Sequence, residues 1–130
     1  MAGYGVFAQV YDKLTLNVPY DQIAEYYDAK IRKFRDGDGN FLADAGCGTG
    51  NLTARLARLG YDVIGAEPSP DMLSEAMNKP HDGVQYICQD MTELDLYGEA
   101  DIIVSTLDSV NHLSSAADIT KFFRAAALNL

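Results

Sequence analysis

The stretch Asp44-Ala45-Gly46-Cys47-Gly48-Thr49-Gly50 lies where a short apolar segment gives way to an amphipathic one. Its three glycines at alternate positions allow a tight turn, and they let a ligand approach the backbone without Cβ atoms in the way. An apolar segment, a glycine-rich turn and a helical segment in this order are typical of one unit of an α/β sheet. We therefore expect this turn to connect the first strand of a parallel sheet to a helix.

The chain on either side of the turn alternates short apolar segments with amphipathic ones, which favours a doubly wound α/β fold. Four segments are expected to form strands: Phe41 to Gly46, Asp62 to Glu67, Val84 to Cys88 and Asp101 to Thr106. Apolar residues recur at helical spacing over residues 52–59, 73–77 and 119–130. Ser69 followed by Pro70 is a typical helix start.

The residues before the first strand are expected to form a helical cap. Ile23, Tyr27, Ile31 and Phe34 recur at helical spacing, and the turn-rich segment from Asp36 to Asn40 ends that pattern. We therefore divide one compact domain into an N-terminal helical cap, residues 1–40, and a sheet-containing core, residues 41–130.

Composition limits the classes of partner. The chain has 130 residues, which suits a single domain, and 19 acidic against 10 basic residues give a net charge of −9. This charge disfavours DNA or RNA as a partner, although the scattered acids also serve ordinary solubility. No apolar run approaches the ~20 residues that span a bilayer, and no secretory signal pattern is found at the start. We expect a cytoplasmic protein with no membrane partner.

The turn discriminates between ligand classes. A dinucleotide-binding turn has a glycine at its sixth position, where this chain has Asn51, and no Gly-Lys-Ser/Thr follows for a phosphate-binding loop. Asp44, two residues before the first glycine, repels a pyrophosphate and attracts an ammonium or a sulfonium group. S-adenosylmethionine carries both cations and no phosphate. The alternative is a strand-to-helix connection that binds nothing.

Two acids follow expected strands. Glu67 closes the second strand, 17 residues after Gly50, where a doubly wound sheet places an acid that accepts hydrogen bonds from ribose hydroxyls. Its alternative role is that of an acid favoured by a helix N-terminus. Asp90 follows the third strand and is suited to accept a bond from an adenine amino group, or it is a surface loop acid. Cys47 and Cys88 have no metal-site spacing, so we expect free thiols and no metal.

These segments resemble, in order, the class I S-adenosylmethionine-dependent methyltransferases. The matching stretches are Asp44 to Gly50, Gly65 to Leu73, Gln89-Asp90-Met91 and Asp108 to Leu113. Phe7 to Asp12 and Val18-Pro19-Tyr20 resemble the small-molecule subgroup that includes sugar-amine and glycine N-methylating enzymes. The resemblance implies a Rossmann-like parallel sheet of about four strands in the order 3-2-1-4, with helices on both faces.

The resemblance also implies roles for individual residues. The glycines would pass under the methionine and ribose of the cofactor, and residues 106–109 would line its methionine end. The implied cofactor contacts are Asp44, Gly46, Cys47, Gly48, Gly50, Glu67, Pro68, Met72, Asp90, Met91, Thr106, Asp108 and Tyr11. Tyr11 suits a sulfonium by cation–π attraction, or it simply packs. Tyr11 and His112 are the weak candidates for a catalytic role, and His112 in a turn is also suited to a structural hydrogen bond.

The expected reaction is methyl transfer from S-adenosylmethionine to a nitrogen or oxygen nucleophile of a small molecule, with S-adenosylhomocysteine as product. A binding module without turnover and an NAD-dependent oxidoreductase are the alternatives. Family members continue past the equivalent of Leu130 into further strands, so we expect either a truncated chain or one completed by a partner. The fourth strand, Ile102-Ile103-Val104, would then be an apolar sheet edge that favours a homo-oligomer.

Overall fold

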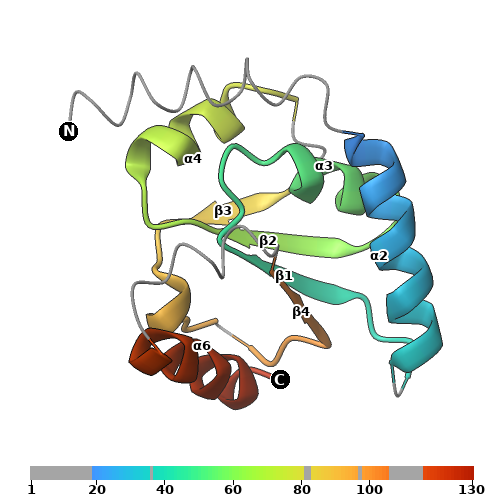
Figure 1. The fold of residues 1–130 in the computed structure, drawn as a ribbon. Coiled ribbons are helices and arrows are strands. Elements are labelled where there is room, and N and C mark those ends of the chain that lie inside the picture. The colour runs from blue at the N-terminus through green and yellow to red at the C-terminus, as the bar shows by residue number, and fades with distance from the viewer. Residues whose placement is uncertain (1–18, 36, 81–82, 97, 106–115) are drawn as a thin grey trace.

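A computed structural model of the chain describes residues 19–35, 37–80, 83–96, 98–105 and 116–130 (Figure 1). In chain order its elements are helix α2 (Tyr20–Phe34), strand β1 (Phe41–Ala45), helix α3 (Asn51–Arg58), strand β2 (Asp62–Ala66), helix α4 (Pro70–Met77), strand β3 (Gln85–Ile87), the 3-10 turn η1 (Met91–Glu93), strand β4 (Ile102–Val104) and helix α6 (Ala116–Leu128). Strands and helices alternate along the chain from β1 onward, as the hydrophobic pattern predicts.

The four strands form one parallel sheet in the order β3-β2-β1-β4, which confirms the predicted order. Ala43 at the centre of β1 lies opposite Ile64 of β2 and Ile103 of β4. Since the strands are parallel, their carboxyl ends meet at one edge of the sheet, and the turn after β1 lies at that edge.

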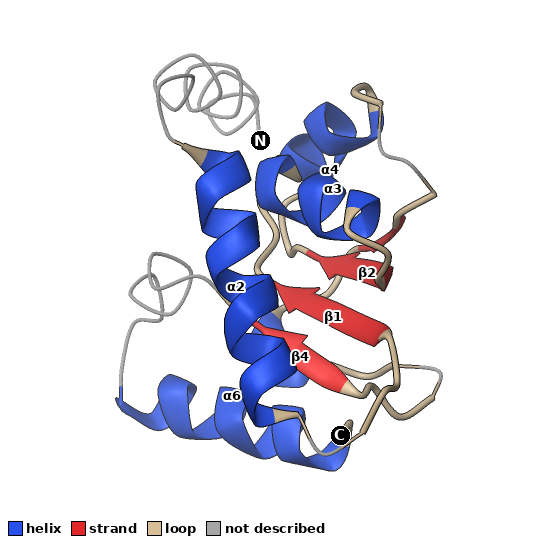
Figure 2. Ribbon diagram, turned by 90° about the vertical axis from the view of Figure 1, so that its right-hand side faces the viewer, coloured by secondary structure: helices blue, strands red, loops and turns tan. Residues whose placement is uncertain are grey.

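Helices cover both faces of this sheet (Figure 2). On one face, Leu42 and Val63 pack with Leu52 and Leu56 of α3 and with Ala24 of α2. On the other face, Ala43, Ile64 and Ala66 pack with Ala125 of α6 and with the segment between η1 and β4. Successive residues of a strand point to opposite faces, so β1 contributes to both clusters. The doubly wound architecture is therefore confirmed.

The sequence predicted the start of α4 correctly, but it predicted the ends of the strands and of α3 less accurately. Ser69 is the N-cap of α4, where its Oγ accepts a hydrogen bond from the Met72 N–H at 3.2 Å, and Pro70 is the first helical residue. Each strand ends one or more residues earlier than predicted. β1 ends at Ala45 because Gly46 already adopts a positive φ of 75°. Leu59 was expected on the apolar helix face but is the C-cap of α3 and is exposed.

The apolar stripes of the outer helices are only partly buried. In α6, Phe122 and Ala126 lie in the core, whereas Phe123 is 61% exposed. Leu130, two residues after the end of α6, is also exposed. Phe34 at the end of α2 is likewise exposed. The sequence also predicts that Ser115 begins the last helix, with Asp118 three residues later, and Ser115 lies outside the described residues. A spacing rule places a side chain on a face but does not show how wide the buried stripe is.

The described half of the predicted cap, α2, packs directly on α3 and the sheet, and Ala24 belongs to the core. Residues 1–18 lie outside the described residues, so the division into a cap and a core stays a prediction. Within the described ranges, no helix has the length and apolar character needed to cross a membrane. The same ranges contain no cluster of three or more potential metal ligands.

Candidate cofactor site

The glycine-rich turn is fixed to the neighbouring strand. Gly46, Gly48 and Gly50 all have positive φ, at 75°, 60° and 81°. The N–H groups of Gly46 and Cys47 both donate to the Ala66 carbonyl at the end of β2, at 2.8 and 3.0 Å. The turn is therefore held at the carboxyl ends of β1 and β2. Its three glycines lie in the left-handed region of backbone conformation, which only glycine adopts at low cost.

The glycines of the turn serve different purposes. A Cβ at Gly48 would meet nothing within 4 Å, so the space above this residue is available to a ligand. A Cβ at Gly50 would collide with the Tyr86 hydroxyl and lie 3.1 Å from Ala76. The missing side chain of Gly50 makes room for the packing of Tyr86, and its contact with the cofactor stays a prediction.

Glu67 connects the turn to the start of α4. One carboxylate oxygen accepts from the Gly48 N–H at 3.0 Å, and the other accepts from the N–H of Ser69, the N-cap of α4, at 3.0 Å. Glu67 therefore binds the start of α4, as its alternative role predicts, and its carboxylate also lies beside the glycine-rich turn. A carboxylate has about four acceptor positions, so bonds from two ribose hydroxyls are compatible with this geometry.

Asp44 is the most deeply buried carboxylate of the site. Its side chain is 1% exposed, and Oδ2 accepts a hydrogen bond from the Thr53 hydroxyl of α3 at 2.8 Å. Among the described residues, Asp44 Oδ1 is the one buried side-chain polar atom without a partner. Burial and the nearby charge of Glu67 raise the pKa of Asp44 to about 7, against the opposing effect of the Thr53 bond. A buried carboxylate oxygen without a hydrogen-bond partner is suited to accept a bond from a cationic donor.

Thr53 was not identified from the sequence. It is a fully buried polar residue in the middle of α3, nine positions after Asp44. A polar residue on the buried face of a short helix was the available signal, because such a hydroxyl needs a partner. Tyr86, which packs against Gly50 and Gly65, gave no comparable signal, since an aromatic residue in a strand is ordinary.

The two cysteines are free thiols, as predicted. Burial, followed by the charges of Asp44 and Glu67, raises the pKa of the Cys47 thiol well above its usual value. Cys47 therefore stays protonated near neutral pH and offers no thiolate nucleophile. Cys88 is exposed, and its Sγ lies 3.5 Å from the Pro68 carbonyl oxygen. Pro68 itself is exposed directly after Glu67.

The segment after β3 presents an acid at the same edge of the sheet. Asp90 is exposed and caps η1, where one of its oxygens accepts from the Thr92 N–H at 2.9 Å and from the Thr92 hydroxyl at 2.8 Å. Met91 packs in the core with Phe122 and Ala126, so only its backbone is suited to the implied adenine contact. Met72 is buried in α4.

The structure brings Asp44, Gly48 and Glu67 together and places Asp90 at the same sheet edge. Four of the predicted residues, Tyr11, Thr106, Asp108 and His112, lie outside the described residues. Ser105, directly before them, donates its hydroxyl to the Ala45 carbonyl at 2.9 Å, which joins the end of β4 to the end of β1.

Comparison with known proteins agrees with this geometry. Residues 42–130 match the family described as "Methyltransferase domain". YqeM of Bacillus subtilis (strain 168), whose name assigns it to the methyltransferases, is 35% identical over 125 residues, which are 94% of this chain and 49% of that protein. A ubiquinone biosynthesis O-methyltransferase of Nitrobacter winogradskyi is 32% identical over 119 residues, or 88% of this chain and 44% of that protein.

A solved structure extends the likeness to the fold. The SAM-bound structure of CalS10, an amino pentose methyltransferase from Micromonospora echinaspora, has a TM-score of 0.81 and 28% identity, and the likeness covers 96% of this chain and 51% of that one. The chain spans about half the length of the curated relatives it matches. With the parallel sheet order and the family match over most of its length, this chain belongs to the class I S-adenosylmethionine-dependent methyltransferases.

Proposed function

We propose that this chain binds S-adenosylmethionine at the carboxyl ends of β1, β2 and β3 and takes part in methyl transfer to a small-molecule acceptor. The observation that carries the proposal is the partnerless oxygen of buried Asp44, which lies on the strand leading directly into the turn that contains Gly48. A ligand with an ammonium and a sulfonium supplies the positive charge that this oxygen lacks.

The residues present fit such a ligand. Asp44 would attract its amino group, Glu67 would accept from the ribose hydroxyls, and Asp90 would accept from the adenine amino group. Tyr11, Thr106 and Asp108 complete the proposed set. S-adenosylmethionine supplies, when bound, a methyl group already activated by a positively charged sulfur. The chain's part is therefore to bind and orient the cofactor, because alignment of the reactants contributes much of the rate in such a transfer.

The acceptor is proposed to be a small molecule with an oxygen or nitrogen nucleophile. The named relatives methylate oxygen in ubiquinone biosynthesis or act on an amino pentose, which supports this range. The net charge of −9 argues against a nucleic acid. We also propose that the protein is cytoplasmic and that copies associate through the outer edge of β4, which pairs with no described strand.

Calorimetry tests the binding step. We expect S-adenosylmethionine and S-adenosylhomocysteine to bind and NAD to give no heat signal at the same concentrations. Tighter binding of NAD would contradict the proposal. A methyl-transfer screen over small amines, hydroxyls and carboxylates then tests turnover. Binding without transfer to any acceptor would instead support a module that holds the cofactor and has no activity of its own.

A further inference from the structure

The two oxygens of the Asp44 carboxylate have different surroundings. Oδ2 accepts a hydrogen bond from the Thr53 hydroxyl at 2.8 Å, whereas Oδ1 is buried and has no hydrogen-bond partner among the described residues. Thr53 is fully buried in α3, the helix that follows the glycine-rich turn. Its β-branched side chain is stiff at χ1, which restricts the positions of the hydroxyl. Thr53 therefore holds one oxygen of Asp44 and leaves the other to a donor that the described residues do not supply.

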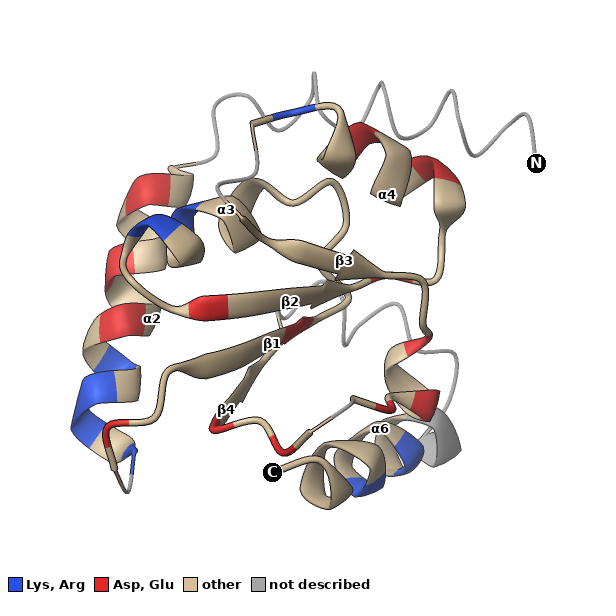
Figure 3. Cartoon of the chain, turned by 180° about the vertical axis from the view of Figure 1, so that it is seen from behind, with Lys and Arg blue, Asp and Glu red and all other residues tan. Residues whose placement is uncertain are grey.

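The described groups that face Asp44 are neutral or negatively charged. The four strands carry no Lys or Arg (Figure 3). Burial raises the pKa of Asp44, and the charge of Glu67 raises it further. Burial also raises the pKa of Tyr27 of α2 and of Tyr86 of β3, and the charge of Asp44 adds to both effects. Since both phenols and the Cys47 thiol stay protonated near pH 7, these groups supply no positive charge to Oδ1.

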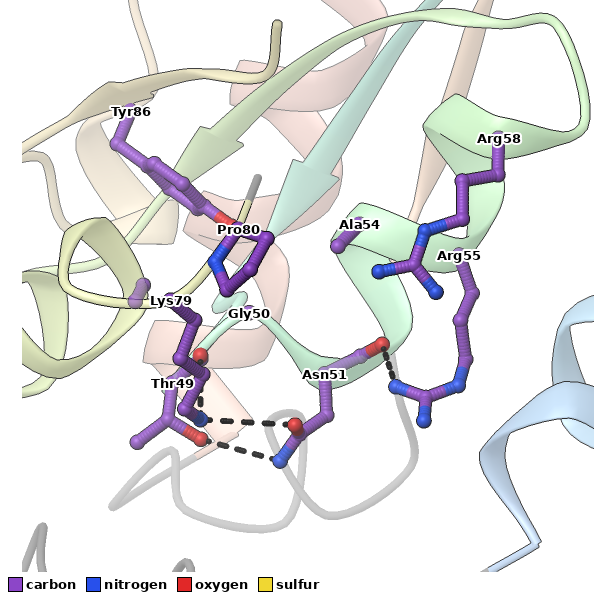
Figure 4. A pocket seen from close by; sticks show the side chains of 10 residues that line it. Thr49, Gly50, Asn51, Ala54, Arg55, Arg58, Lys79, Pro80 and Tyr86 are labelled. Atoms are coloured by element: carbon purple, nitrogen blue, oxygen red, sulfur yellow. Dashed lines mark hydrogen bonds between the residues drawn. The ribbon is translucent and has the colours of Figure 1, made fainter. Parts of the chain in front are cut away.

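Thr53 lies between three parts of the site. Besides its bond to Asp44, it affects two buried neighbours: burial raises the pKa of the Tyr86 phenol and of the Cys47 thiol, and a hydrogen bond with Thr53 opposes the rise in both. Tyr86 extends from β3 toward Gly50 of the turn (Figure 4). These contacts fix the Thr53 hydroxyl between β1, β3 and the turn, so the Asp44 oxygen that it bonds is also held in place.

The bond from Thr53 has two consequences for Asp44. A carboxylate rotates broadly about its last torsion, and a bond to Oδ2 restricts that rotation. The bond also favours the charged form of Asp44, because it opposes the rise in pKa that burial causes. An ionised carboxylate with one unbonded oxygen accepts a charge-assisted hydrogen bond from an ammonium group, and such bonds are about twice as strong as those between neutral groups.

We propose that Thr53 is a positioning residue for the amino group of the cofactor. It holds Asp44 so that Oδ1 accepts a hydrogen bond from that ammonium, and the site thereby favours ligands that carry an amino-acid end. Thr53 acts through Asp44 and has no ligand contact of its own. This role of Thr53 rests on the proposed function, because it assigns one acceptor of the site to one part of the proposed ligand.

Two ligands that differ at the amino-acid end test this role. S-adenosylhomocysteine and methylthioadenosine share the adenosine and the thioether, but only the first carries an ammonium. In calorimetry, Thr53→Val should weaken the binding of S-adenosylhomocysteine about tenfold and leave the affinity for methylthioadenosine unchanged, since only the first ligand bonds to Asp44. Thr53→Ser keeps the hydroxyl and should retain both affinities. Equal losses for the two ligands, or no loss for either, would overturn the role of Thr53.

Further variants separate positioning from folding. Thr120→Val makes the same change at an exposed position of α6 and should leave both affinities unchanged. If Thr53→Val does not fold, Thr53→Ala removes the same hydroxyl with a residue that favours helices, and it should show the same selective loss. Retained binding of methylthioadenosine shows that a variant is folded.

A double variant tests whether Thr53 acts through Asp44. In an Asp44→Asn chain, Thr53→Val should cause no further loss of affinity for S-adenosylhomocysteine, and a further tenfold loss, of about the size expected in the unmodified chain, would contradict the role of Thr53. If the unmodified chain binds neither ligand, the proposed function itself fails. If it binds both and Thr53→Val weakens both equally, the cofactor site stands and only the positioning role is wrong.

Discussion

Gly48 and Gly83 have similar backbones in different surroundings. Their φ values are 60° and 82°, and a Cβ would meet nothing within 4 Å at either position. A side chain at either site carries the strain of the left-handed region, about 1–2 kcal/mol. At Gly48 the side chain would also occupy the space where we propose that the cofactor lies. We expect Gly48→Val to abolish S-adenosylmethionine binding in calorimetry and to leave a folded chain.

Gly83→Val is the matched control for this experiment. It introduces the same side chain at a similar φ, away from the turn, so it should lose a comparable amount of stability and keep its affinity for the cofactor. If both variants bind as well as the unmodified chain, the cofactor does not lie over Gly48. If both lose binding equally, the effect comes from stability and not from the turn.

Asp44 links stability to pH. Its pKa is raised to about 7 in the folded chain by burial, whereas an unfolded chain has an ordinary value near 3.8. Between these values the folded state binds more protons than the unfolded state, so its stability falls as pH rises from about 4 to about 7 and then levels off. The full shift corresponds to roughly 4 kcal/mol at most.

Replacing Asp44 tests this fall of stability with rising pH. Asp44→Asn should remove much of the fall in stability across that pH range and should be more stable than the unmodified chain at pH 8. Urea unfolding at a series of pH values measures the difference between the two chains. Asp62→Asn, at an exposed position at the start of β2, is the control and should keep the original pH dependence. If the unfolding free energies of the Asp44 variant and the unmodified chain change with pH in the same way, Asp44 is not a buried titrating group.

At the scale of elements, β2 and β3 are paired strands, and Tyr86 of β3 lies opposite Gly65 of β2. Gly65 of β2 lacks a positive φ, but a Cβ there would lie 2.8 Å from the Tyr86 ring and 3.0 Å from Cys47 Sγ. Gly65→Ala should therefore destabilise the chain through overpacking, by about 1–3 kcal/mol in urea unfolding. Gly37→Ala, where a Cβ meets nothing within 4 Å, is the control. Adding Tyr86→Val should recover part of the loss, and no recovery would show that the ring is not the obstacle.

Asn129 ties the end of α6 to the segment before β4. Its buried amide donates to the Leu94 and Ala125 carbonyls at 2.9 and 2.8 Å, and its oxygen accepts from the Leu96 N–H at 2.9 Å. Asn129→Ala leaves these backbone groups without their partner, and we expect a loss of about 2–3 kcal/mol in unfolding free energy. Asn78→Ala, at an exposed position after α4, should cost far less. Equal losses would contradict this role of Asn129.

The sequence predicted those parts of the fold that depend on residues close to one another in the chain. Hydrophobic alternation, the glycine turn and the Ser69-Pro70 start are local signals, and the succession of strands and helices and the cap of α4 follow them. The strand order was implied by the family resemblance and not by these signals. Tyr86 and Asn129 act through contacts between elements far apart in the chain, so spacing alone gave no sign of their partners. Thr53 lies only nine positions after Asp44, but its bond depends on how α3 packs against β1. The acid at the end of β2 was predicted, but its bonds to the Gly48 and Ser69 amides depend on how two turns meet in space.

At the scale of the whole molecule, the outer edge of β4, which no described strand covers, and the net charge of the chain should have opposite effects on the association of copies. The outer side of β4 pairs with no described strand, and exposed backbone groups of this kind favour association of copies. Ile102 and Val104 are buried, so the attraction comes from the strand backbone and not from an apolar side-chain patch. Each copy carries a charge of −9, and two such copies repel each other over a distance that shrinks as salt is added.

Association through β4 should therefore increase with ionic strength. We expect light scattering after size exclusion to give a mass between one and two chains of 14.2 kDa at low salt, and a mass nearer two chains as sodium chloride is raised. Salt has the opposite effect on an assembly held by ion pairs, because it screens the attraction that such an assembly needs. A mass of one chain at every salt and protein concentration would show that the β4 edge does not drive association, and a mass that falls with salt would assign the assembly to charged surfaces instead.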